Sequence, residues 1–362
     1  MPLVFIAGTR PEINKIVPVM VALQAQGLHP LLLLTGQHTS LLDGTPLHAI
    51  THVTPLDLPS DGNIPRWLQQ AEAVLDRSLQ VIRDACEEVV VVVQGDTMSA
   101  LAGAEAAERA GIPIAHIEAG VRSHDLMEPW PEEGFRVRIT QLAQWHYAPT
   151  RQAFAHLVLE GIPATKILVT GNTGISALHT SGVTPIREPH PQIVVTLHRR
   201  ELTRDRERLQ AVMVALLDAF GRHPEVQVIW PLHPSIAKIP LPEMPLPVRA
   251  HVQWVAPMAA VPFLRLVAGS MGVLTDSGGL VEEAAHLGVP TAILRAQNDR
   301  PEAVTAGIAR CFDPSPEGAT AAVQCLMDQT IPRRPHTCYG FPDAAQHIAQ
   351  HLQSLASPIL RT

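Results

Sequence analysis

Short apolar runs alternate with longer amphipathic segments in the first half of the chain. The short runs are mostly apolar on both faces, which is typical of strands buried inside a parallel sheet. They lie at residues 3–7, 31–35, 89–93 and 114–118. The longer segments have helical periodicity and lie at residues 11–26, 69–88 and 99–110. This alternation predicts a parallel sheet with helices on both sides.

The same alternation restarts after residue 190. It predicts strands at residues 193–197, 227–232, 273–275 and 291–294, with helices at residues 204–222 and 279–287. The segment between the halves, residues 181–191, is rich in proline and polar residues, so we expect an interdomain linker there. The chain is therefore predicted to be an α/β protein with two doubly wound domains. Ligands of such sheets lie beyond the carboxyl ends of the strands, so a cleft between the domains is the expected site.

Composition and charge exclude several classes of protein. The 362 residues fit about two domains, and a hydrophobic fraction of 46% excludes a disordered chain. No apolar run approaches the roughly 20 residues that span a bilayer. The net charge of −7 does not favour a nucleic acid partner. The four cysteines form no C-x-x-C pair and no signal peptide precedes the first strand, so we expect a cytoplasmic protein without a zinc site or disulfide framework.

Two strand–helix turns, one in each half, have the composition of anion-binding sites. In the first, Gly8 permits a tight turn and Arg10 stands at the start of the next helix. In the second, Ser277, Gly278 and Gly279 can offer backbone N–H groups to a diphosphate, and Glu282 or Glu283 can accept bonds from ribose hydroxyls. Each turn alone also fits an ordinary helix start. Together they favour a shared nucleotide diphosphate.

Acidic residues follow neighbouring predicted strands in the first half. Asp96 and Glu118 stand at strand ends on one edge of the sheet, and Glu132 follows a loop. Each alone also fits a helix cap or a solvated acid. If the three carboxylates converge, their mutual repulsion raises the proton affinity of some of them, which suits acid–base chemistry.

Basic residues mark strand ends in the second half. His198 and two arginines follow the first strand of this half. They can bind phosphate groups, or they can form a surface turn held by salt bridges. His233 ends the following strand and is a weaker candidate. The chain has no Asp-x-Asp pair that would hold a metal–diphosphate, so a metal-independent site is expected.

These segments together resemble the bacterial non-hydrolysing UDP-N-acetylglucosamine 2-epimerases. Ten segments match in the family's order over about residues 4–310. They are Gly8-Thr-Arg-Pro-Glu12, Thr35-Gly-Gln-His38, Gly95-Asp-Thr97, His116-Ile-Glu-Ala-Gly-Val-Arg122, Pro129-Trp-Pro-Glu-Glu133, Ala148-Pro-Thr150, Val169-Thr-Gly-Asn-Thr173, His198-Arg-Arg-Glu201, Thr275-Asp-Ser-Gly-Gly279 with Glu282-Glu283, and Arg300-Pro-Glu302. The resemblance implies a GT-B fold of two Rossmann-like domains, at residues 1–182 and 190–340, with a helix in residues 343–362 packed back on the first. It also implies a homodimer.

The resemblance implies reversible C2 epimerisation of UDP-GlcNAc to UDP-ManNAc for surface polysaccharide synthesis. UDP leaves C1 as the C2 proton is removed, and re-addition to 2-acetamidoglucal inverts C2. Catalytic roles are implied for Asp96, Glu118, Glu132, Arg136 and His198. Contacts with the substrate or UDP are implied for Arg10, Lys15, His233, Phe263, Ser277, Gly278, Gly279, Glu283 and Arg300. Among these, Glu283 would hold the ribose and Phe263 would lie by the uracil. The resemblance implies no nicotinamide, metal or other cofactor.

Several positions depart from the family pattern. Phe135 replaces the Asn that precedes the catalytic arginine, and the loop at residues 59–65 is short and lacks a matching Arg. Thr39-Ser40 replaces a polar run, and residues 337–342 also differ. Since that loop region helps a second UDP-GlcNAc bind as an activator in bacterial members, we expect weak or no such activation. Four alternatives stay open: an epimerase of a modified UDP-sugar such as a 3-acetamido uronate, a hydrolysing 2-epimerase, a GT-B glycosyltransferase and a non-catalytic nucleotide-sugar sensor.

Overall fold

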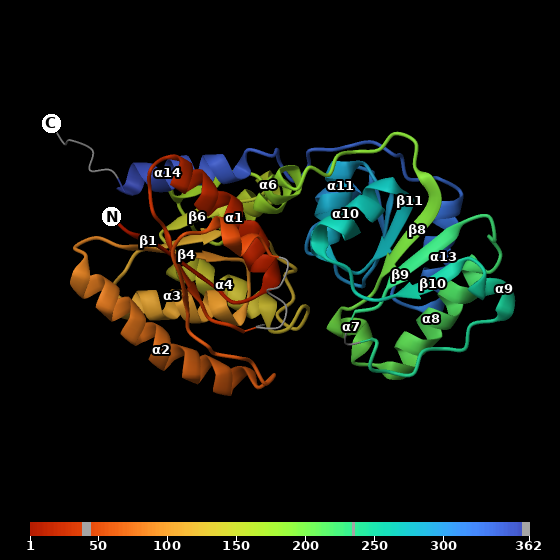
Figure 1. Cartoon of the computed structure of the whole chain (residues 1–362), viewed down its shortest axis with the longest axis horizontal. Coiled ribbons are helices and arrows are strands. Elements are labelled where there is room, and N and C mark those ends of the chain that lie inside the picture. Colours follow the sequence, from red (N-terminus) through yellow and green to blue (C-terminus); the bar gives the residue numbers. More distant parts are fainter. Residues whose placement is uncertain (38–44, 234–235, 357–362) are drawn as a thin grey trace. The chain divides into compact units, whose positions relative to one another are not determined.

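A computed structural model describes residues 1–37, 45–233 and 236–356. The chain forms two compact units (Figure 1). Unit 1 contains Met1–Thr180 and the segment that begins at Gly340, and unit 2 is Ser181–Tyr339. Each unit is built around one parallel sheet, as the strand–helix alternation predicted.

Unit 1 has a seven-stranded sheet in the order β3-β2-β1-β4-β5-β6-β7. Its strands are β1 (Leu3–Ala7), β2 (Leu31–Leu34), β3 (Val53–Pro55), β4 (Val90–Gln94), β5 (Ile114–Ile117), β6 (Trp145–Ala148) and β7 (Ile167–Val169). Its helices are α1 (Arg10–Ala25), α2 (Ile64–Ala85), α3 (Met98–Ala110), α4 (Glu132–Leu142), α5 (Arg151–Leu159), α6 (Thr173–Thr180) and α14 (Ala344–Ala356), with short 3-10 turns at η2 (Pro46–Ala49) and η3 (Ala164–Lys166). The order places β4 and β5, which precede Asp96 and Glu118, side by side at the centre of the sheet.

Alternate residues of the central strands feed two different cores. In β1, Val4 and Ile6 belong to the apolar cluster under α2 and α3, whereas Leu3 and Phe5 belong to the cluster under α1 and α14. Figure 1 shows these helix pairs on opposite sides of the sheet. A strand that is buried on both faces needs apolar residues at every position, which explains the continuous apolar runs in the sequence.

Unit 2 has a six-stranded parallel sheet in the order β10-β9-β8-β11-β12-β13. Its strands are β8 (His190–Thr196), β9 (Gln227–Pro231), β10 (Val252–Val255), β11 (Ser270–Thr275), β12 (Thr291–Leu294) and β13 (Ala309–Phe312). Its helices are α7 (Arg200–Thr203), α8 (Arg206–Phe220), α9 (Leu246–Arg249), α10 (Ala260–Gly269), α11 (Gly278–Leu287), α12 (Glu302–Thr305) and α13 (Pro316–Met327). Figure 1 shows α10 and α11 on one face of this sheet and α8 and α13 on the other.

Several element boundaries differ from the prediction, among them the beginnings of α2 and β8, which lie next to prolines. Helix α2 begins at Ile64 rather than at residue 69, because Asn63 caps it and Pro65 fits the first turn, where a helix needs no N–H donor. Strand β8 begins at His190, inside the predicted linker. Pro191 is tolerated there because the pairing of β8 with β11 shifts register between Ser270 and Gly272. Within the described residues, no helix combines the length and apolar composition needed to cross a membrane.

Candidate active site

The turn between β1 and α1 is shaped by close packing at Gly8. A Cβ atom at this position would lie 1.9 Å from Thr35 Oγ1, so no larger residue fits without a shift. Thr9 caps α1 through a capping box, in which its hydroxyl accepts from the Glu12 N–H and the Glu12 carboxylate accepts from the Thr9 N–H. Arg10 is the first residue of α1 and is partly exposed. Since Glu12 and Thr9 accept from the N–H groups of Gly8, Thr9 and Glu12, the partly exposed Arg10 is the group that this turn offers to an anion.

Glu12 is a buried carboxyl group that the sequence reasoning did not single out. It is 1% exposed, and its oxygens accept from the Gly8 N–H (3.0 Å), the Thr9 N–H (2.8 Å), the Thr9 hydroxyl (2.7 Å) and the Thr97 hydroxyl (2.6 Å). Burial raises the pKa of Glu12 to about 7, because desolvation outweighs these hydrogen bonds. Glu12 thereby joins the first turn to the turn that carries Asp96. The spacing Thr-x-x-Glu before an apolar run was the signal that could have found it.

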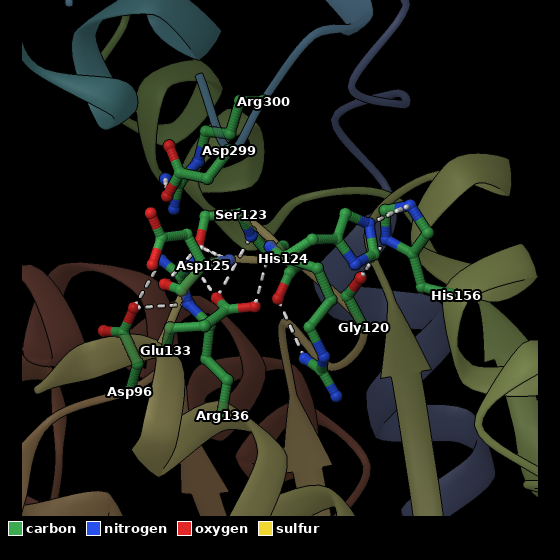
Figure 2. A network of polar contacts seen from close by, with 12 residues as sticks. Asp96, Gly120, Ser123, His124, Asp125, Glu133, Arg136, His156, Asp299 and Arg300 are labelled. Atoms are coloured by element: carbon green, nitrogen blue, oxygen red, sulfur yellow. Dashed lines mark hydrogen bonds and ion pairs between the residues drawn. The ribbon is translucent and has the colours of Figure 1, made fainter. Parts of the chain in front are cut away.

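Asp96 follows β4 and is held by the guanidinium of Arg136 from α4 (Figure 2). Arg136 donates to Asp96 Oδ2 from Nε at 2.8 Å and lies 2.6 Å from it through Nη2. Arg136 Nη1 donates to Glu133 Oε2 at 3.1 Å. The arginine is buried, while a quarter of the Asp96 side chain is exposed (25%), so Asp96 is the member of this group that a ligand can reach.

Glu118 follows β5, the strand paired with β4, and is held by two partners. Lys15 from α1 forms an ion pair with Glu118 Oε2, and Gln94 donates to the same oxygen at 2.6 Å. Glu118 has φ 67°, a left-handed backbone conformation that is uncommon for a residue with a side chain. Such conformations persist where surrounding contacts hold them, and they cluster at functional sites. Lys15, Asp96, Glu118 and Arg136 are thus brought to one edge of the unit 1 sheet.

Glu132 is the first residue of α4, and its Oε2 atom is buried without a hydrogen-bond partner among the described residues. The expectation of three mutually repelling carboxylates omitted the cations. Asp96 faces Arg136 and Glu118 faces Lys15, so attraction to these groups opposes repulsion between the carboxylates. The sequence could not show these pairings because they join residues 40 and 103 positions apart.

In unit 2, His198 follows β8 and is oriented by Asp276 at the end of β11. Asp276 Oδ2 accepts from the backbone N–H groups of His198 (2.7 Å) and Arg199 (2.8 Å). Asp276 Oδ1 lies 3.2 Å from His198 Nδ1, close enough for charge attraction but poorly aligned for a hydrogen bond. Burial lowers the pKa of His198; the charge of Asp276 opposes this shift, whereas the positive charges of Arg199 and Arg295 add to it. A lowered pKa favours the neutral imidazole, in which one ring nitrogen donates and the other accepts a hydrogen bond.

Arg300 lies against the start of α11, where a nucleotide diphosphate was expected. It is buried and forms ion pairs with Glu282 and with Asp299 (3.0 Å). A Cβ atom on Gly278 would lie 2.6 Å from Arg300 Nη1, so this glycine allows the guanidinium to approach the backbone. Glu282 is thus occupied by Arg300. Glu283 is the partly exposed acidic residue of the pair.

The remaining predicted residues of unit 2 lie around the same strand ends or on α10. His233 follows β9, and its ring centroid is 5.3 Å from that of His198. Burial lowers the pKa of His233, with a further contribution from His198. Ser277 precedes α11 and Gly279 is its second residue, whereas Phe263 lies on α10 and is partly buried. Across the described residues, no group of three or more His, Cys, Asp or Glu side chains could hold a metal ion.

The departures from the family pattern fall in different places. Phe135 packs against the apolar cluster beneath α2 and α3, to which Leu58 and Ile64 from the short loop region also contribute. The aromatic ring at position 135 is therefore part of a core. Thr39 and Ser40 lie outside the described residues.

A family model described as UDP-N-acetylglucosamine 2-epimerase matches residues 22–353. The chain belongs to this family. It is therefore an epimerase, an enzyme of the isomerase class, as the ordered motifs predicted. One relative is the UDP-N-acetylglucosamine 2-epimerase of Neisseria meningitidis serogroup A, which is 34% identical over 328 residues that cover 85% of this chain and 86% of the relative. The Salmonella typhimurium enzyme of the same name is 33% identical over 385 residues, with 98% and 99% covered.

Solved structures of epimerases have the same architecture. The crystal structure of UDP-GlcNAc 2-epimerase from Neisseria meningitidis bound to UDP-GlcNAc has a TM-score of 0.86 and 29% identity, and the match covers 98% of this chain and 100% of that one. The glycosyltransferase of kitacinnamycin has a TM-score of 0.64 at 14% identity over 98% of both chains, which shows a common fold alone. The GT-B fold of this epimerase is confirmed.

Proposed function

We propose that this epimerase interconverts UDP-GlcNAc and UDP-ManNAc. The observation that carries the proposal is the edge of the unit 1 sheet, where two carboxylates are each fixed by a cation. The named family members and the UDP-GlcNAc-bound relative support the choice of substrate.

The chemistry must remove a proton from C2, which has no adjacent carbonyl group to acidify it. In the proposed path the C1–O bond breaks and UDP leaves with the electron pair. A carboxylate takes the C2 proton, and a C1=C2 double bond forms in 2-acetamidoglucal. UDP then adds back to C1 while a proton is delivered to the opposite face of C2. Atoms and charge balance over the cycle without an oxidant or reductant.

Unit 1 supplies the proton-transfer groups in this proposal. Asp96 and Glu118 are held in fixed orientations, which general acid–base catalysis requires. Glu132 has a carboxylate oxygen without a partner in the described chain, so it can take or give a proton without breaking a hydrogen bond. Arg136 beside Asp96 and Lys15 beside Glu118 carry positive charge. This charge reduces the electrostatic repulsion between the two carboxylates and the departing diphosphate.

Unit 2 supplies the UDP-binding groups. The N–H groups at Gly278 and Gly279 open α11, a helix of 10 residues, and favour a diphosphate there, whereas the Ser277 N–H donates to Thr275 Oγ1 at 2.9 Å. Arg300 lies at the same turn, with its charge paired to Glu282 and Asp299. We assign the ribose to Glu283 and the departing phosphate oxygen to His198, whose ring N–H can donate a hydrogen bond to it. We further propose that the enzyme works as a homodimer in surface polysaccharide synthesis.

The deciding experiment is proton NMR of the purified protein with UDP-GlcNAc in deuterated water, without added metal or nicotinamide. The expected result is UDP-ManNAc, with deuterium at C2 of both sugars. Free UDP that accumulates in step with N-acetylmannosamine would show a hydrolysing enzyme instead. Binding of UDP-GlcNAc with retention of the C2 proton would overturn the substrate assignment, and modified UDP-sugars would be tested next.

A further inference from the structure

A buried carboxylate that the proposed chemistry does not use lies behind the catalytic groups of unit 1. Glu133 is 2% exposed and is the second residue of α4. Its Oε2 atom accepts from Arg136 Nη1 (3.1 Å) and from the Ser123 N–H (3.1 Å), and its Oε1 atom accepts from the His124 N–H (3.1 Å). Figure 2 shows this carboxylate between the guanidinium and the backbone of the loop. Solvent barely reaches Glu133, so it is poorly placed to touch a substrate.

The first partner of Glu133 is the arginine that holds Asp96. The Arg136 guanidinium is 5% exposed and bridges the two carboxylates, with Nε and Nη2 on Asp96 and Nη1 on Glu133. A guanidinium is planar, so a bond at Nη1 fixes the plane in which the other two nitrogens meet Asp96. Without Glu133, the contact that holds Nη1 is lost, and the plane of the guanidinium at Asp96 is less firmly fixed. The orientation of Asp96 therefore depends on a residue that it does not touch.

The second partner is the backbone that follows Glu118. From Glu118 to His124 the chain takes a left-handed conformation at Glu118 (φ 67°), Gly120 (φ 83°) and His124 (φ 63°). A non-glycine residue in this region costs roughly 1–3 kcal/mol unless surrounding contacts hold it. The Glu133 carboxylate supplies one such contact, on the His124 N–H.

The opposite side of the same segment is held by His156 from α5. His156 Nδ1 donates to the Gly120 carbonyl at 2.9 Å, and His156 Nε2 lies 3.3 Å from His124 Nε2 (Figure 2). His156 and Glu133 thus hold the segment that begins at Glu118 through contacts at Gly120 and His124. All of these contacts lie within unit 1.

We propose that Glu133 is a positioning residue for the epimerase, which orients Asp96 through Arg136 and fixes the segment that begins at Glu118. The expected effect on kcat rests on the proposed function. The expected effect on the orientation of Arg136 and on the Ser123 and His124 amides rests on contacts within unit 1 alone. Removal of Glu133 changes the geometry of two reacting groups and leaves the UDP-binding turn of unit 2 untouched.

The test compares Glu133→Gln and Glu133→Asp with wild type, and uses Asp76→Asn as the control. Asp76 also pairs with an arginine of unit 1, Arg109 at 2.8 Å, but this pair joins α2 to α3 and involves no residue of the segment that begins at Glu118. For Glu133→Gln we expect kcat to fall by about 10²-fold with little change in KM, because misplaced reacting groups slow the chemical step. We expect Glu133→Asp, which keeps the charge, to recover part of the loss, and Asp76→Asn to retain wild-type kcat.

A double-mutant cycle separates positioning from a general loss of stability. If Glu133 acts through Arg136, then Glu133→Gln adds little further loss of kcat in an Arg136→Lys background. Full additivity of the two losses would overturn the proposal, as would an equal loss in the Asp76→Asn control. If Glu133→Gln does not fold, the same cycle is run with Glu133→Asp.

Two readouts do not depend on turnover. Hydrogen exchange should be faster at the Ser123 and His124 amides in Glu133→Gln, and a crystal structure of that variant should show Arg136 turned away from its contact plane with Asp96. If the wild type binds UDP-GlcNAc without converting it, the proposed function fails, and these two readouts still decide the positioning role. An unchanged Arg136 with unchanged amide exchange would refute that role.

Discussion

Replacement of Glu12 by Gln should remove a pH dependence from the stability of unit 1. Glu12 has its pKa raised from 4.5 to about 7 by burial, so the folded chain keeps a proton that the unfolded chain releases between these values. In that window the unfolded state binds fewer protons, and the free energy of unfolding therefore falls as pH rises. The difference in pKa corresponds to about 3 kcal/mol, lost between pH 4.5 and about 7. The Gln side chain is neutral throughout and avoids this loss.

The structure indicates why Gln fits the position. Its amide oxygen can accept from the Gly8 and Thr9 groups that now contact Glu12 Oε2, and its NH₂ group can donate to Thr97 Oγ1, which now contacts Oε1. The two proteins should thus be similarly stable near pH 4.5, and the variant should be more stable by about 3 kcal/mol at pH 8.

Urea unfolding from pH 4.5 to 8, followed by hydrogen exchange in peptides from β1 and β4, measures this difference within unit 1. The exposed Glu87 gives the matched control, Glu87→Gln, for which the difference from wild type should not change with pH. A difference between Glu12→Gln and wild type that is constant across the range would refute the reasoning. So would a variant that is less stable at pH 8, since the charged carboxylate would then be a net stabiliser of the helix N-terminus.

Three further predictions follow from particular contacts. Gly8→Ala should lower the melting temperature and slow the epimerase, because its Cβ would clash with a hydroxyl at 1.9 Å; a variant with unchanged melting temperature and rate would contradict this. Asp276→Asn should lower kcat by roughly 10²–10³-fold at nearly unchanged stability if Asp276 orients His198 toward the departing phosphate, and wild-type kinetics would show that it does not. Leu75→Ala, in the core beneath α2, should cost about 2–5 kcal/mol in urea unfolding; a loss below 1 kcal/mol would mean that the site collapses around the smaller side chain.

The sequence was most informative where one local rule decided the outcome. Continuous apolar runs predicted strands such as β1 and β12 to the residue, because a strand between two helical layers must be apolar on both faces. The beginnings of helix α2 and strand β8 were predicted too late: Pro65 fits the first turn of α2, and Pro191, counted as a linker residue, fits a shifted register. Ten ordered motifs were enough to identify the family.

The tertiary structure decided which charges meet. Asp96 and Glu118 could be placed on one edge from sequence, but Lys15 and Arg136 as their partners could not, because that depends on which helices cover the edge. Glu12 escaped notice for the same reason: the pattern shows a cap, and only burial in the folded unit gives its carboxyl group a raised pKa. The sequence by itself therefore determined the family, through motif order, and the strands and helices with the clearest periodicity. It did not predict β3, β6, β7, β10 or β13, which are short strands. The electrostatics of the site rest on long-range packing, and the fold alone decides them.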